Sequence, residues 1–111
     1  MTAIYKILTR GEWRQAQQQG QFTGSAVDLK DGFIHLSTAA QAQETAQKHF
    51  RDQGDLVVLE LETEALGPAL RWEPSRGGAL FPHLYGPLAT GHVLRVLDAP
   101  LDAEGIPRLS L

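Results

Sequence analysis

The side chains of this sequence that can do chemistry are its four histidines, its carboxylates and its hydroxyl groups, because the chain has no cysteine. The absence of cysteine excludes a thiolate nucleophile, a disulfide framework and any cysteine-based zinc or iron–sulfur site. The histidines show neither the HxxxH nor the HxH spacing of zinc ligands; they are His35, His49, His83 and His92. We therefore predict no metal site, and any reaction must use imidazole, carboxylate, hydroxyl or backbone groups.

The first cluster of polar groups lies in the sequence GFIHLST, which ends at Thr38. His35 and Ser37 are two residues apart, so they share one side of an extended strand. Thr38 caps a predicted helix, whose free N–H groups and partial positive charge favour a phosphate or carboxylate. We predict a catalytic role for His35 and ligand-binding roles for Ser37 and Thr38. Taken alone, the segment favours the alternative of a plain helix cap and a hydrogen-bonded core histidine, because capping needs no ligand.

The second cluster is the sequence RWEPSRGG, which holds an arginine before two glycines. Arg76, Gly77 and Gly78 can bring a guanidinium and exposed N–H groups up to an anion, because glycine allows close approach of the backbone. We predict that these three residues bind the ligand and that Glu73 supplies a catalytic carboxylate. The alternative is an ordinary turn in which Glu73 pairs with Arg71 or Arg76.

The third cluster is the sequence LFPHLYGPL, in which His83 and Tyr85 have the two-residue spacing of one strand face. This spacing offers a titratable imidazole beside a ring that can stack on a planar group. We predict a catalytic role for His83 and a ligand-binding role for Tyr85. The alternative places Phe81 and Leu84 in the core and His83 on the surface as a loop residue.

Hydrophobic periodicity predicts the elements that must position these clusters. Two helices follow capping-box spacings, one at Thr9 and Glu12 and the other at Thr38 and Gln41. Lys6 interrupts an otherwise apolar face of the first strand. We expect strands over residues 3–8, 33–36, 56–62 and 92–97, and helices over residues 10–19 and 39–50, the second with its apolar face formed by Ala39, Ala42, Ala46 and Phe50.

Two segments rich in glycine, proline and other turn formers are predicted to be irregular, residues 21–32 and 66–87. A compact domain rarely keeps about twenty structureless residues unless they build a site, so the second segment is expected to carry function. The apolar neighbours of Trp13 and Trp72 place both rings in the predicted core. Residues 107–111 are expected to add a short edge strand.

Length and composition predict a single domain that spans residues 1–111. The apolar fraction of 42% and the charged fraction of 21% are ordinary for a globular protein. A net charge of -3 offers no footprint for duplex nucleic acid or an anionic membrane, which favours a small-molecule ligand. The sequence shows no signal peptide and no membrane-spanning apolar run, so we expect a cytoplasmic protein.

The motifs above resemble those of the DUF952 family, which comprises small bacterial and plant proteins. The resemblance covers most of the chain and is most specific in DGFIHLST and LFPHLYG, with further matches in IYKI, in Trp72-Glu73 and in SRGG. It implies an α+β fold of the ADP-ribosyltransferase superfamily. Such a fold is a compact split β-sheet with two main flanking helices.

The resemblance further implies an NAD- or ADP-ribose-like nucleotide as ligand, with NAD as a substrate. In ADP-ribosyltransferases an early strand carries a polar residue that holds ribose, and Lys6 is in the similar place here. The implied roles are pyrophosphate binding by Arg76, ribose binding by His35 and Ser37, base stacking by Tyr85, and proton transfer by His83 or Glu73.

Two functions remain open from the sequence. The first is an enzyme, either an ADP-ribosyltransferase-like transferase or an NAD glycohydrolase, and the cluster of histidines, Arg76 and Glu73 favours it. The second is a non-catalytic nucleotide-binding or protein-interaction module. The absence of glutamate from residues 85–97, where ADP-ribosyltransferases carry a catalytic glutamate, favours this second function.

Overall fold

The computed structural model describes residues 2–111, and for Arg76 it describes the backbone alone. In this part of the chain, antiparallel sheets combine with three α-helices, so the fold is α+β as the sequence predicts. The strands are β1 (Ala3–Thr9), β2 (Gln21–Phe22), β3 (Ile34–His35), β4 (Ser37–Thr38), β5 (Leu56–Glu62), β6 (Leu70–Pro74), β7 (Leu80–Leu84), β8 (Leu88–Ala89) and β9 (Val93–Asp98). The helices are α1 (Arg10–Gln19), α2 (Ala26–Asp31) and α3 (Ala39–His49), with 3-10 turns η1 (Thr63–Ala69), η2 (Arg76–Gly78) and η3 (Thr90–His92).

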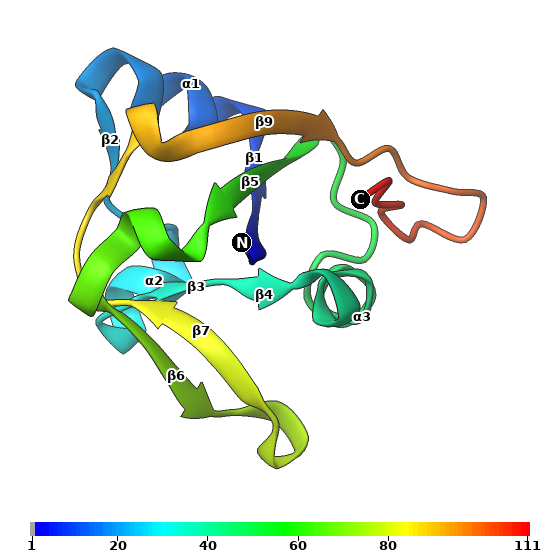
Figure 1. Cartoon of the computed structure of the whole chain (residues 1–111). Coiled ribbons are helices and arrows are strands. Elements are labelled where there is room, and N and C mark those ends of the chain that lie inside the picture. Colours follow the sequence, from blue (N-terminus) through cyan, green and yellow to red (C-terminus); the bar gives the residue numbers. More distant parts are fainter. Residues whose placement is uncertain (1) are drawn as a thin grey trace.

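The central sheet has the strand order β4-β1-β5-β9 and is covered on both faces near β1 (Figure 1). Ile4 and Leu8 of β1 lie in one core cluster with Trp13 of α1, whereas Tyr5 and Ile7 lie in a second cluster with residues of α3. This alternation is the one that the sequence predicts for a strand buried on both faces. The two main helices therefore flank opposite faces of the sheet.

A second sheet has the order β3-β7-β6, and one extended segment joins it to the central sheet. β3 pairs with β7, whereas β4, which starts two residues after β3 ends, pairs with β1. Leu36 lies between the two strands, and its N–H donates to the carbonyl of Pro82 at 3.1 Å. Figure 1 shows β3 and β4 running between β1 and the β6–β7 hairpin. The polar residues His35 and Ser37 thus lie on either side of the switch between sheets.

The two predicted helices begin as their capping residues require, and α1 also ends at its predicted glycine. At α1, Thr9 Oγ1 accepts from Glu12 N at 3.0 Å, the Glu12 carboxylate accepts from Thr9 N at 2.9 Å, and Gly20 ends the helix with φ 80°. At α3, Thr38 and Gln41 form the same reciprocal cap. Ala39 is exposed, contrary to its predicted place on the apolar face, because burial begins one turn later, at Ala42 and Ala46.

Residues 21–32 are not a loop, contrary to the sequence prediction, since they contain β2 and the short helix α2. The turn-forming residues of this segment are the caps of α2. Ser25 precedes the helix and donates its N–H to Asp28 Oδ2 at 2.9 Å, and Gly32 ends it with φ 86°. Such local hydrogen bonds are shared by turns and helix ends, so the sequence pattern of this segment does not distinguish a loop from a short helix.

Residues 66–87 are not irregular either, because β6 and β7 form a hairpin with Trp72 opposite Pro82 and the turn η2 at its tip. Prolines at both strands led to the prediction of a loop. Pro82 lies inside the middle strand of its sheet, and although it has no N–H to donate, its carbonyl still pairs with Leu36. The segment that was expected to carry function is therefore a β-hairpin within the second sheet rather than a loop.

Two further expectations fail. Trp13 is buried as predicted, but Trp72 is 42% exposed, because it lies on the hairpin between Arg71 and Glu73 and away from both core clusters. Residues 107–111 form no edge strand; the backbone there makes a single isolated bridge between Leu101 and Pro107.

Within residues 2–111, no helix has the length and apolar character needed to cross a bilayer.

Candidate functional site

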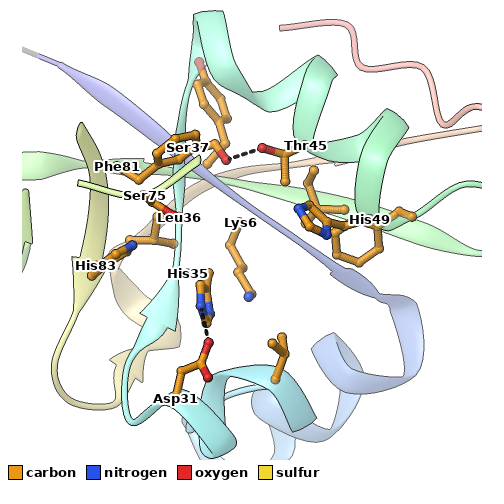
Figure 2. A pocket seen from close by; sticks show the side chains of 14 residues that line it. Lys6, Asp31, His35, Leu36, Ser37, Thr45, His49, Ser75, Phe81 and His83 are labelled. Atoms are coloured by element: carbon orange, nitrogen blue, oxygen red, sulfur yellow. Dashed lines mark hydrogen bonds and ion pairs between the residues drawn. The ribbon is translucent and has the colours of Figure 1, made fainter. Parts of the chain in front are cut away.

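A cavity of about 270 Å³ lies between β1, α2, α3, the segment of the sheet switch and the β6–β7 hairpin (Figure 2). Its walls bring together polar side chains from segments that lie far apart in the sequence. Those that matter for chemistry are Lys6, Asp31, His35, Ser37, His49 and His83.

Asp28 lies behind this cavity and holds two of the residues that line it. Its side chain is 1% exposed, and Oδ2 accepts from Lys6 Nζ at 2.8 Å and from Ser25 N at 2.9 Å. Oδ1 lies 2.6 Å from His35 Nδ1 and accepts from His35 N at 3.0 Å. Burial raises the pKa of Asp28, but the hydrogen bonds from His35 and Lys6, the charge of Lys6 and the Ser25 N–H outweigh it and hold the pKa well below its usual range. Asp28 is therefore an ionised, fully bonded carboxylate.

Lys6 extends from β1 into the cavity although only 4% of its surface is exposed. Asp28 is its ion-pair partner, and the Phe22 ring centroid lies 5.8 Å from Nζ. Burial lowers the pKa of the Lys6 ammonium, and the negative charge of Asp28 opposes this shift. The amine is thus closer to its neutral, nucleophilic form than a lysine in water.

His35 lies between two carboxylates. In addition to the Asp28 contact, His35 Nε2 lies 2.9 Å from Asp31 Oδ2, and Figure 2 shows this pair at the edge of the cavity. Both ring nitrogens donate at the same time only in the protonated imidazolium. The His35 side chain is 33% exposed and that of Asp31 41% exposed, so solvent and ligands have access to this pair.

His83 is held by a second carboxylate, that of Glu73. His83 Nδ1 lies 2.9 Å from Glu73 Oε1, and the Tyr85 hydroxyl donates to the same oxygen at 2.6 Å. The hydrogen bonds from Tyr85 and His83 lower the pKa of Glu73, and the bond to Glu73 raises the pKa of Tyr85. Phe33 stacks on the His83 ring with centroids 4.0 Å apart. The imidazole is thereby fixed in orientation by a carboxylate and an aromatic face.

The cavity wall on the α3 side carries hydroxyl groups. Ser37 is buried, and its Oγ lies 3.1 Å from Thr45 Oγ1, which donates to the Gln41 carbonyl at 3.1 Å. Thr38, in contrast, does not line the cavity, and its hydroxyl accepts from Gln41 N at 3.3 Å. Thr38 is accordingly a helix cap, as the alternative interpretation of this segment states.

The structure brings four of the ten predicted site residues to the cavity wall: Lys6, His35, Ser37 and His83. Glu73 and Tyr85 are not in the wall, but they support His83 from behind. Arg71, one predicted partner of Glu73, has its guanidinium 5.0 Å from the centre of the Tyr85 ring.

The remaining predicted residues lie elsewhere. Gly77 and Gly78 are in η2, at the tip of the hairpin, and do not line the cavity. The ligand-binding prediction for Arg76 concerns its side chain, which lies outside the described part of the structure.

Sequence reasoning missed Asp28 and Asp31, the aromatic partner Phe33 and, as a cavity residue, His49. A signal for Asp28 was present, since a lysine inside a buried strand requires a buried counter-charge. Within the described residues, no group of three or more histidine and acidic side chains is arranged to hold a metal ion.

The arrangement provides two imidazoles that face one cavity, each with a carboxylate at Nδ1. The His35 and His83 ring centroids are 5.7 Å apart. A carboxylate at Nδ1 fixes the orientation and the tautomer of an imidazole, which prepares the ring for general acid–base work.

Comparison with known proteins identifies the family. The crystal structure of protein CC0527 from Caulobacter crescentus is 62% identical, with a TM-score of 0.95 over 97% of this chain and 95% of that one. The solution NMR structure of the same protein is 62% identical, with a TM-score of 0.88 over 98% of this chain and 94% of that one. No curated protein matches the sequence. The family model described as "Protein of unknown function (DUF952)" matches residues 7–96, and the chain therefore belongs to the DUF952 family.

Proposed function

We propose that this chain binds the ribosyl part of an NAD- or ADP-ribose-like nucleotide in the cavity, where His35 and His83 act as acid–base groups. One observation carries the proposal. Two imidazoles, each oriented by a carboxylate at Nδ1, come from different strands to the wall of the same cavity. Paired acid–base groups of this kind suit a polar ligand whose protons must be moved.

The size of the cavity supports a sugar-sized ligand rather than a whole dinucleotide. Its volume of about 270 Å³ lies just below the range of roughly 300–1,000 Å³ that is typical of drug-sized ligands. The hydroxyl groups of Ser37 and Thr45 line one wall, and the Asp31 carboxylate lines another. A ribose fits this lining because its hydroxyl groups both donate and accept hydrogen bonds. The rest of a nucleotide would extend outward past the exposed side chains of His49 and Asp31.

The same groups suit cleavage of a glycosidic bond. When the bond between the anomeric carbon and a leaving base breaks, its electron pair leaves with the base and the sugar becomes an oxocarbenium-like cation. Asp31 offers negative charge to that cation, and His83 with Glu73 can take the proton of an attacking water or acceptor hydroxyl. Glu73, on the hairpin, thus supplies a carboxylate that residues 85–97 lack. We include in this proposal a relationship to the ADP-ribosyltransferase superfamily, which the split between the two sheets supports.

The second candidate is a non-catalytic nucleotide-binding module, and the contacts of His35 favour it. Both nitrogens of this ring are already within hydrogen-bond distance of carboxylates, at Asp28 and at Asp31. A ring held in this way binds well but exchanges protons with a ligand only if Asp31 moves aside.

Calorimetry with ADP-ribose, NAD and nicotinamide tests binding, and product analysis after incubation with NAD separates the two candidates. We expect ADP-ribose to bind and His35→Gln to weaken that binding about tenfold, through loss of a charge-assisted hydrogen bond. The matched control is His92→Gln, because His92 is exposed and does not line the cavity. If none of the three compounds binds, or if both variants weaken binding equally, the proposal is wrong.

A further inference from the structure

Lys6 differs from the two other lysines of the sequence. Lys30 and Lys48 are exposed on α2 and α3, whereas Lys6 is buried and lines the cavity. In Figure 2 its nitrogen lies in the space beside His35. The proton-transfer roles assigned to the two histidines above make no use of this amine.

The surroundings of Lys6 Nζ combine a counter-ion with an acid–base group. Asp28 bonds Nζ through one carboxylate oxygen and His35 through the other, so the amine and the imidazole are neighbours on one carboxylate. Burial lowers the pKa of Lys6, which favours the neutral amine. A buried lysine next to an acid–base group is the arrangement in which an amine attacks carbonyl carbon.

We propose that Lys6 forms an imine with the aldehyde carbon of an open-chain ribosyl phosphate bound in the cavity. This inference rests on the proposed function and names the reacting form of its ligand. A ribose with a free anomeric carbon, as in ADP-ribose or ribose 5-phosphate, opens to an aldehyde, whereas the glycosidic bond of NAD prevents opening.

The reaction balances without a further reagent. The Nζ lone pair attacks the aldehyde carbon, and the carbon–oxygen bond of the resulting carbinolamine then breaks. Starting from the ammonium, two of its three protons leave with the carbonyl oxygen as water, and the third stays on the iminium nitrogen. His35, held by Asp28 at Nδ1, is placed to carry protons from nitrogen to oxygen when Asp31 moves away from Nε2.

The charge of the site is unchanged by this step. Lys6 begins as a cation opposite Asp28 and ends as an iminium cation opposite the same carboxylate. The buried ion pair therefore survives imine formation, and no carboxylate is left uncompensated inside the protein. Asp28 has the position of a counter-ion to the iminium.

Trapping with cyanoborohydride tests the inference on the whole, unmodified protein. The folded protein is incubated with ribose 5-phosphate and cyanoborohydride, which reduces an iminium to a stable secondary amine, and each lysine is then quantified by peptide mass spectrometry. We expect Lys6 to be labelled at least about tenfold faster than Lys30 or Lys48, because the cavity holds the sugar next to Lys6 and the exposed lysines have no such site. Equal or slower labelling of Lys6 overturns the inference.

Three controls make this result specific. Ribitol 5-phosphate has no carbonyl, so an excess should slow Lys6 labelling and leave the exposed lysines unaffected. Unfolding in urea should remove the preference for Lys6. Asp31→Asn keeps the Lys6–Asp28 pair and should slow labelling at Lys6 alone. If the preference for Lys6 persists under all three conditions, labelling does not depend on the cavity, and the inference fails.

Calorimetry separates this inference from the proposed function. If ADP-ribose binds but Lys6 is not labelled selectively, the imine is excluded and nucleotide binding stands. If ADP-ribose does not bind, nucleotide binding is excluded, and selective labelling would then support only a site for an aldehyde-bearing sugar phosphate.

Discussion

The two imidazoles of the cavity depend on carboxylates in opposite surroundings. Asp28, behind His35, has a side chain that is 1% exposed, and it also holds a buried lysine and the start of α2. Glu73, beside His83, has a side chain that is 34% exposed, and its partners are the ring nitrogen and the Tyr85 hydroxyl. Asp28 therefore contributes both to the site and to the stability of the fold, whereas Glu73 mainly orients the His83 ring.

Removal of the buried charge tests this difference most strongly. Asp28→Asn keeps the size of the side chain but leaves the Lys6 ammonium without its counter-charge, so we expect the free energy of unfolding to fall by about 3–5 kcal/mol. Urea denaturation measures the change. The matched control is Asp55→Asn, which removes an exposed partner of Arg10 and should leave the unfolding midpoint nearly unchanged. Similar midpoints for the two variants would show that the buried pair does not stabilise the fold.

Acid should reduce the contribution of Asp28. Its pKa is lower in the folded protein than the ordinary value of 3.8, so the unfolded chain takes up a proton first as the pH falls. The stabilisation is then fully present above pH 3.8 and is lost as the pH falls from there toward the folded-state pKa. In urea melts at successively lower pH, the advantage of the wild type over Asp28→Asn should narrow in this window. A constant advantage throughout the acid range would contradict the lowered pKa.

Substitution of Glu73, the partly exposed carboxylate, should have the smallest effect on stability and a measurable effect on ligand binding. Glu73→Gln leaves the fold intact but removes the charge that orients His83, so we expect an unchanged unfolding midpoint and several-fold weaker ADP-ribose binding. Tyr85→Phe removes only the second donor to Glu73 and should weaken binding less. A large loss of stability in Glu73→Gln would mean that both carboxylates are structural.

Local signals explain why much of the fold could be predicted. The strand alternation of residues 3–8 and the capping boxes at Thr9 and Thr38 depend only on near neighbours, and each is confirmed. The segments that contain α2 and the β6–β7 hairpin were misassigned, because their prolines, glycines and aspartates have the same preferences in turns and in element ends. Tertiary pairing, as between Leu36 and Pro82, decided the outcome there.

The site was less predictable than the fold, since its geometry depends on contacts between distant segments. Lys6 and Asp28 are 22 residues apart, and the spacing of either residue says nothing of the other. The polar residues of two-residue spacing, His35 with Ser37 and His83 with Tyr85, were recognised because strand geometry places them on one side. Their partners, Asp28 and Phe33, are identified only by tertiary contacts in the structure.

The change of sheets at Leu36 places residues of two different sheets in the wall of one cavity. Because His35 is paired with the hairpin and Ser37 with the central sheet, a rotation of the hairpin against β1 would change the distance between these two side chains. Two hydrogen bonds oppose such a rotation, one from Leu36 N to the Pro82 carbonyl and one from Gln41 Nε2 to the Leu80 carbonyl. The distance between the imidazole and the hydroxyl wall therefore depends on contacts between the two sheets as well as on the pairing within each sheet.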